Sequence, residues 1–168
     1  MKQHCPLLAA AILVAMSGCA TAPVAVQAPV GPNPAIRASG DRAGQLSVYT
    51  AREQMHNDSQ FQTAYYQETA YAIYDSGGRK IRNVNNNNSS EFFAVPRTIE
   101  LPPGRYQIHA WMASGLGERV IVPVVVESGR KTEVHLDGKW PQSADTDGRV
   151  VMGPGGFSIG WRADAGNL

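Results

Sequence analysis

The stretch from Arg97 to Gly138 constrains the fold most, because it carries four strand patterns separated by turn patterns. From Arg105 to Met112 the side chains fall into two alternating sets, and a period of two places each set on its own face of a strand. The preceding Leu-Pro-Pro-Gly sequence, Leu101 to Gly104, predicts a turn, because proline has no N–H to donate to a sheet. The stretch therefore predicts consecutive antiparallel strands of a β-sandwich.

The second half of this stretch predicts two more strands. Val120 to Glu127 is β-branched on both faces, as expected of a strand that is covered on both sides. Pro123 removes one ladder hydrogen bond from its middle, so we expect an edge position or a bulge there. Ser128 and Gly129 then predict a hairpin turn into a strand from Arg130 to Leu136.

The composition favours one all-β domain and argues against a nucleic-acid partner. The 168 residues include 17 glycines and 11 prolines, and no stretch shows a long apolar period of 3.6 residues. Fifteen basic against fourteen acidic residues give a net charge of +1 without a basic stripe, so we expect no nucleic acid to bind. Both cysteines, Cys5 and Cys19, precede the domain, which excludes a disulfide framework within it.

Residues 1–18 have the architecture of a signal peptide. Lys2 forms a short basic region, an apolar stretch runs from Pro6 to Met16, and small residues precede Cys19. The apolar stretch is too short to span a bilayer, which takes about 20 residues. A plain secretory signal cut near Ala20 remains an alternative.

The sequence Met16 to Cys19, Met-Ser-Gly-Cys, resembles the lipobox of bacterial lipoproteins, with methionine in the usual place of leucine. The resemblance implies that Cys19 is lipidated with fatty acyl groups such as palmitate and becomes the first residue, anchored to a membrane. Two or three acyl chains make such anchoring stable. Ala20 and Thr21 follow the cysteine where an inner-membrane lipoprotein has Asp, and by the same resemblance this implies a lipid anchor in the outer membrane of the cell envelope.

The remaining boundaries follow from composition. Residues 19–44, after and including the lipidated cysteine, are rich in alanine and proline and predict a flexible tether. The sandwich domain is expected at residues 45–163, and residues 164–168 form a frayed tail. The first half of the domain predicts three strands, at Leu46 to Glu53, Thr69 to Asp75 and Arg79 to Val84. A turn at Ser76 to Gly78 joins the second and third of these strands, and the polar tract from Asn85 to Ser90 is expected on the surface.

The order of these motifs resembles the carboxypeptidase regulatory-like, or transthyretin-like, β-sandwich. Asp75 and Gly78 match its D-x-x-G turn, Leu101 to Tyr106 matches its L-P-P-G-x-Y turn, and Val126 to Leu136 matches its closing strand. The resemblance covers roughly residues 69–136. It implies an immunoglobulin-like sandwich of about seven strands that serves as a non-catalytic binding or accessory module without a fixed ligand.

No motif in the domain predicts catalysis, a metal site or a cofactor. A nucleophilic site needs a positioned base beside a serine or cysteine, and the domain offers three histidines, His56, His109 and His135, without a Gly-x-Ser-x-Gly elbow. His109 and His135 with Asp137 form at most a minimal metal set, and surface imidazoles are usually just solvated. Asp145 to Gly148 fits a turn better than a calcium loop, since the remaining ligands are missing.

Aromatic side chains are the candidate ligand contacts. Trp111, on the half-exposed strand face with His109, and Trp140, before a proline, could stack on sugar rings. The apolar face of an indole matches the C–H face of a pyranose, and its N–H is a donor. Tyr65 and Tyr66, in a predicted loop, are a second pair of candidates. The alternative for each tryptophan is packing against a neighbouring strand.

The sequence thus predicts a lipid-anchored envelope protein with a non-catalytic interaction module. Binding of another envelope protein, through an exposed strand edge, is the first hypothesis. A glycan- or peptidoglycan-binding module that uses exposed aromatics is the alternative. An unpaired strand would favour the first hypothesis, and an aromatic shelf around Trp111 with polar neighbours would favour the second.

Overall fold

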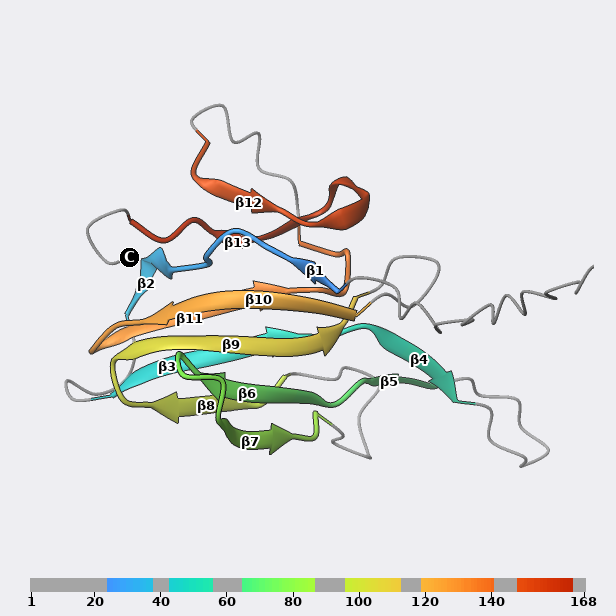
Figure 1. Ribbon diagram of the computed structural model, residues 1–168. Coiled ribbons are helices and arrows are strands. Elements are labelled where there is room, and N and C mark those ends of the chain that lie inside the picture. The colour runs from blue at the N-terminus through green and yellow to red at the C-terminus, as the bar shows by residue number, and fades with distance from the viewer. Residues whose placement is uncertain are drawn as a thin grey trace, which may run out of the picture.

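Two β-sheets packed face to face form the body of the protein, which confirms the predicted all-β sandwich (Figure 1). The structure is a computed structural model that describes residues 24–37, 43–55, 65–86, 96–112, 119–140 and 148–164. Within these ranges it has thirteen strands and one short 3-10 turn, where the sequence predicted about seven strands.

The five-stranded sheet holds, in spatial order, β1 (Ala25–Val26), β10 (Arg119–Val126), β9 (Gly104–Trp111), β6 (Tyr71–Asp75) and β7 (Lys80–Val84). The four-stranded sheet holds β2 (Pro32–Arg37), β11 (Arg130–His135), β3 (Gly44–Tyr49) and β8 (Thr98–Leu101). Two ribbons complete the fold: β4 (Arg52–Met55) with β5 (Tyr65–Glu68), and β12 (Val150–Met152) with β13 (Ser158–Trp161), the latter pair flanking the turn η1 (Pro154–Gly156). Figure 1 shows the β4–β5 ribbon projecting from one end of the sandwich and the β12–β13 ribbon lying along one long edge.

The core lies between the inward faces of the two sheets. Leu46 and Val48 of β3 face Ile73 of β6 and Ile108 of β9, and all four side chains are fully buried. Each such side chain contributes about 1.5–3 kcal/mol through removal of its apolar surface from water. The alternation read from the sequence therefore assigns the buried face of β9 correctly.

The strand neighbours differ from the predicted order in two respects. The sheets are mixed, because β11 pairs with β3 and β1 pairs with β10 in parallel. The turn at Ser128 and Gly129 exists, with Gly129 at a φ of 64°, but it carries the chain from β10 in one sheet to β11 in the other. The predicted hairpin is therefore wrong. A period of two shows that a strand has one buried face, but it does not show which sheet the strand joins.

Residues 24–37 belong to the sandwich, where a flexible tether was expected. Val30 is fully buried, its N–H donates to Pro123 O at 2.9 Å, and its carbonyl accepts from Val125 N at 2.9 Å. Gly31 N then donates to Trp161 O of β13 at 2.7 Å. The segment thus bonds in turn to the five-stranded sheet, to the β12–β13 ribbon and, through β2, to the four-stranded sheet. Composition indicated a tether because so many of these residues are Ala and Pro. Of the rest of the predicted tether, Gly44 begins β3, and residues 19–23 and 38–42 lie outside the described residues.

Pro123 occupies a place in β10 where no donor is needed. Its partner in β9 is Gln107, in regular register without a bulge. On the other side β1 covers only Val120 and Ile121, and the next rung is the bond from Val30 to the carbonyl of Pro123. β10 is therefore neither an edge strand nor bulged at Pro123, and the expectation of one or the other is wrong. The proline is tolerated because it lies between the rungs to β1 and the bridge from Val30 to Val124.

Both predicted turns around β6 and β9 have side chains that hold them. Asp75 Oδ1 accepts from the N–H groups of Gly77 and Arg79 at 3.0 and 2.9 Å, and these bonds hold the pKa of Asp75 below its usual range. Tyr106 donates its hydroxyl to Pro102 O at 2.8 Å across the Leu-Pro-Pro-Gly turn. The turn motifs therefore act through local hydrogen bonds.

We predict that Gly160→Ala destabilises the fold by about 1–3 kcal/mol, because a methyl group there would overpack the junction of β13 with Val30. The added Cβ would lie 2.5 Å from Val30 Cγ1 and 2.8 Å from Glu133 O. Denaturant unfolding of the full chain measures the effect. Gly77→Ala is the control, since its Cβ would meet only Asp75 Oδ1 at 3.4 Å. Equal stability of the two variants would contradict the packing of residues 24–37 into the sandwich.

Candidate functional site

The outward face of the five-stranded sheet carries a groove across β10, β9, β6 and β7, which lie side by side (Figure 1). Because Ile108 and Ala110 of β9 point into the core, His109 and Trp111 point outward. His109 lies opposite Ala72 of β6, and Trp111 lies opposite Arg119 of β10. The alternation that builds the core thus also builds the floor of the groove.

The groove has a volume of about 640 Å³ and combines aromatic, small apolar and polar side chains. Its lining consists of Val24, Ala70, Tyr71, Ala72, Tyr74, Lys80, Asn83, His109, Ala110, Trp111, Arg119, Val120 and Ile121. This size and mixture are typical of sites that bind small organic ligands or short polymer segments.

Two cations in the groove rest on aromatic rings. The guanidinium of Arg119 lies 4.7 Å from the ring centre of Trp111, and Lys80 Nζ lies 5.8 Å from that of Tyr74. Tyr74 in turn stacks on His109 with ring centres 4.2 Å apart. Burial and the charge of Lys80 lower the pKa of His109, so this imidazole is neutral at pH 7.

The structure places the two predicted tryptophans in different surroundings. Trp111 is 38% exposed in the groove, with Arg119 over its ring. Trp140 stacks on His135 with ring centres 4.9 Å apart and meets Trp161 edge-on at 5.7 Å. Trp111 therefore remains a candidate ligand contact, whereas Trp140 packs inside an aromatic stack on the four-stranded sheet. Tyr65 and Tyr66 lie in β5, but their side chains are outside the described part, as is Cys19.

The structure does not bring His109 and His135 together. His109 belongs to β9 of the five-stranded sheet, whereas His135 belongs to β11 of the other sheet, where it stacks on Tyr49. Among the described residues, no three His, Cys, Asp or Glu side chains gather as metal ligands would.

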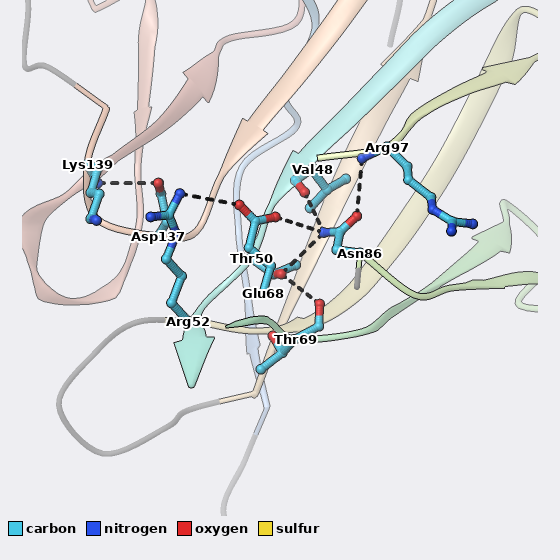
Figure 2. Close-up of polar contacts among 9 residues, drawn as sticks. All are labelled: Val48, Thr50, Arg52, Glu68, Thr69, Asn86, Arg97, Asp137 and Lys139. Atoms are coloured by element: carbon cyan, nitrogen blue, oxygen red, sulfur yellow. Dashed lines mark hydrogen bonds and ion pairs between the residues drawn. The ribbon is translucent and has the colours of Figure 1, made fainter. Parts of the chain in front are cut away.

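A buried polar cluster at one end of the sandwich was not predicted (Figure 2). We call it the Glu68 cluster; its members are Thr50, Arg52, Glu68, Thr69 and Asn86. Glu68 is 1% exposed, and its Oε1 lies 3.6 Å from Arg52 Nη2, an ion pair beyond hydrogen-bonding distance. Asn86 Nδ2 donates to Glu68 Oε2 at 3.1 Å and to Thr50 Oγ1 at 3.3 Å. The cluster thus provides some of the hydrogen bonds that a buried carboxyl group needs.

Asn86 acts as an extra rung between two strands of the four-stranded sheet. The pairing of β3 with β8 ends at Ser47 and Thr98. Beyond it, Asn86 Nδ2 donates to Val48 O at 2.9 Å, and Arg97 N donates to Asn86 Oδ1 at 3.4 Å. The side-chain amide thus takes the place of a peptide group. Asn86 is 1% exposed, so the expectation that its asparagine-rich tract lies wholly on the surface is wrong at this residue.

Burial raises the pKa of Glu68 from 4.5 to about 7, although the nearby charge of Arg52 acts in the opposite direction. A carboxyl group with such a pKa can accept or donate a proton near neutrality. Its contacts, however, are Arg52, Asn86 and the backbone around Thr50, and it does not line the groove. We therefore assign it to the architecture of the sandwich.

Backbone bonds connect the Glu68 cluster to the groove. Thr50 Oγ1 donates to Thr69 O at 2.6 Å, and Thr69 N donates to Ala51 O at 2.9 Å. Ala51 N donates to Trp111 O at 3.3 Å. The cluster therefore supports the end of β9 that presents Trp111.

The alternation of β9 was sufficient to find Trp111 and His109, but not Arg119, Lys80 and Tyr74. Arg119 follows a glycine-rich turn, and Lys80 sits next to a turn, where charged residues are common and carry no signal. Glu68 and Asn86 lie in polar stretches that showed no periodicity. Arg119, Lys80 and Tyr74 come together in the groove through the register of neighbouring strands, and this register is known only from the tertiary structure.

We predict that the contribution of Glu68 to the stability of the protein decreases as the pH rises from about 4.5 to 7, because folded Glu68 holds its proton more tightly than the unfolded chain does. The contribution is present below pH 4.5 and is lost as the pH passes about 7, with a size on the order of 3 kcal/mol. Glu68→Gln removes this dependence in denaturant unfolding between pH 4 and 8. Glu100→Gln, at an exposed position of β8, is the control and should retain it. Parallel curves for wild type and Glu68→Gln would contradict the assignment.

No family model, no curated protein and no solved structure matches the chain. Within the described ranges, no helix has the length and apolar character needed to cross a membrane.

Proposed function

We propose that this protein is a lipid-anchored protein of the outer membrane whose non-catalytic β-sandwich binds a glycan in the groove of the five-stranded sheet. The observation that carries this proposal is the groove itself, with Trp111 exposed beside polar side chains. Sugars present apolar C–H faces and many hydroxyl groups, so their sites combine aromatic surface with donors and acceptors.

The polar side chains of the groove suit this ligand. Asn83 offers both an amide donor and an acceptor. The neutral ring of His109 uses its Nε2 in a contact with Gln107 Oε1 at 3.4 Å and offers the ligand an acceptor at Nδ1. The guanidinium of Arg119 lies over the Trp111 ring, which is still 38% exposed, so a sugar on the exposed indole also lies close to the guanidinium.

The second candidate, capture of another envelope protein, has its own supporting observation. In the described part of the chain, β7 ends the five-stranded sheet, and its residues from Lys80 to Asn83 are exposed. An added strand could pair with such an edge. Lys80 and Arg82 lie on it, however, and charged side chains on an edge strand discourage pairing. The groove is therefore the better-supported site.

The membrane anchor at Cys19 determines where the groove would act. The five residues from Ala20 to Val24 span at most about 18 Å when fully extended. Val24 already lines the groove. An acylated Cys19 would thus keep the groove close to the membrane surface, where glycans near the outer membrane are within reach.

We predict that Trp111→Ala weakens retention of the protein on purified glycan material, such as sacculi, about tenfold, because the exposed aromatic surface of the groove is lost. Pull-down and quantification of the bound full chain measure the effect. Phe157→Ala is the matched control, since Phe157 is 37% exposed and lies outside the groove. Retention of one detergent-solubilised envelope protein by both variants, without retention on glycans, would instead support the edge of β7.

We predict that Cys19→Ser abolishes incorporation of radiolabelled palmitate and releases the protein from the membrane fraction, because Cys19 is the proposed acyl acceptor. Cys5→Ser, which changes the other cysteine of the chain, should leave both labelling and fractionation unchanged. Labelling that survives in Cys19→Ser would refute the lipid anchor without affecting the proposal for the groove.

A further inference from the structure

We infer that the groove selects an acidic saccharide, one that carries carboxylate or phosphate groups at two positions along its length. This inference rests on the proposed glycan-binding function and adds the chemical class of the ligand. It is carried by the charge, the support and the spacing of two basic residues in the groove.

The charge of the groove is uniformly positive. Of its lining residues, Lys80 and Arg119 are charged, and no carboxylate lines it in the described part of the chain. Four other basic side chains in the described ranges have acidic partners. These pairs are Arg52 with Glu68, Arg79 with Asp75, Arg130 with Glu127, and Lys131 with Glu133. The two groove cations have no such partner among the described residues, so no carboxylate of the described ranges competes with an anionic ligand.

Aromatic rings hold both cations in place and leave their hydrogen-bond donors available. The ring of Trp111 attracts the guanidinium of Arg119 at 4.7 Å, and that of Tyr74 attracts Lys80 Nζ at 5.8 Å. A cation over a ring face makes no hydrogen bond to it, so the donors remain for carboxylate or phosphate oxygens. A positioned guanidinium also loses less conformational entropy on binding.

The strand register places the Cα atoms of the two basic residues far apart across the groove. Lys80 pairs with Tyr74, and Tyr74 with Gln107, which lies four residues along β9 from the partner of Arg119, Trp111. Three strand spacings of about 4.8 Å and four residues of about 3.3 Å place the Cα atoms roughly 20 Å apart. The arrangement suits an elongated ligand that bears an acidic group near each end of the groove.

The surface between the two cations is neutral. Asn83 and the uncharged imidazole of His109 can bond sugar hydroxyls, while Ala72 and Ile121 offer apolar contact. A polymer of acidic sugars matches this order of positive, neutral and positive contacts. An acidic peptide shares the charge but lacks the hydroxyl groups that the neutral middle can bond.

The test uses the full chain, purified in a zwitterionic detergent that contains no sugar. Four oligomers of similar length are titrated by calorimetry: an oligogalacturonate, a phosphorylated oligomannose, a neutral oligogalactan and an oligoglutamate. We expect both acidic saccharides to bind at least tenfold more tightly than the neutral one, and this preference to shrink at high salt. Comparison of the oligogalacturonate, which carries carboxylates, with the phosphorylated oligomannose shows which acidic group the groove prefers.

Variants locate the charge effect. Arg119→Gln and Lys80→Gln should each weaken binding of the acidic saccharides about tenfold and weaken binding of the neutral oligogalactan by a smaller factor. Arg105→Gln is the matched control, because Arg105 lies on the outward face of the same strand β9 but outside the groove. The salt dependence of wild type gives a second readout that needs no variant.

The outcomes separate the inference from the proposed function. Equal affinity for neutral and acidic saccharides would overturn the acidic class and leave glycan binding intact. Tighter binding of oligoglutamate than of either acidic saccharide would overturn the inference in favour of an acidic peptide. Binding of none of the saccharides would overturn both the inference and the proposed function.

Discussion

The two hydrogen bonds between Val30 and β10 are the interaction on which the arrangement of layers depends. Val30 is fully buried, and its neighbour Gly31 bonds to β13, so one short segment connects the five-stranded sheet with the β12–β13 ribbon. β2 then carries the same segment into the four-stranded sheet. Each buried peptide group needs a partner, and the side of β10 around Pro123 would otherwise offer unpaired carbonyl groups. Residues 24–37 therefore close an edge of the sandwich, and they also bring Val24 to the rim of the groove.

The groove depends on the same core in a different way. Every inward residue of β9 forces its neighbour outward, so the packing of Ile108 and Ala110 aims His109 and Trp111 at the groove. The rings of Trp111 and Tyr74 then position Arg119 and Lys80. A rigid sheet supports all four strands concerned, which limits the entropy lost when a ligand binds. The groove is thus preorganised by the sheet and charged by residues from its outer strands.

The Glu68 cluster shows how a polar stretch can enter a core. Glu68 and Asn86 are buried because the pairing of β3 with β8 ends early and leaves Val48 O to be satisfied. Asn86 fills this gap, and the carboxyl group of Glu68 accepts one of its donated bonds. Burial of the carboxyl raises its pKa, which ties the proton of one side chain to the stability of the fold. Through Thr69 and Ala51, the cluster also holds the backbone of Trp111.

The sequence by itself determined the all-β class, the buried face of β9, the turns after Asp75 and Leu101, and the exposure of Trp111, because all of these follow from local periodicity and turn chemistry. Only the tertiary structure decided that residues 24–37 are part of the sandwich, that β10 and β11 belong to different sheets, and that Lys80 and Arg119 border one groove. These features depend on which strands become neighbours. The side-chain pattern of a strand shows that one face is buried. Apart from proline, however, every residue offers the same backbone donor and acceptor, so the pattern does not say which strand will be the neighbour. That choice depends on the packing and register of the whole fold.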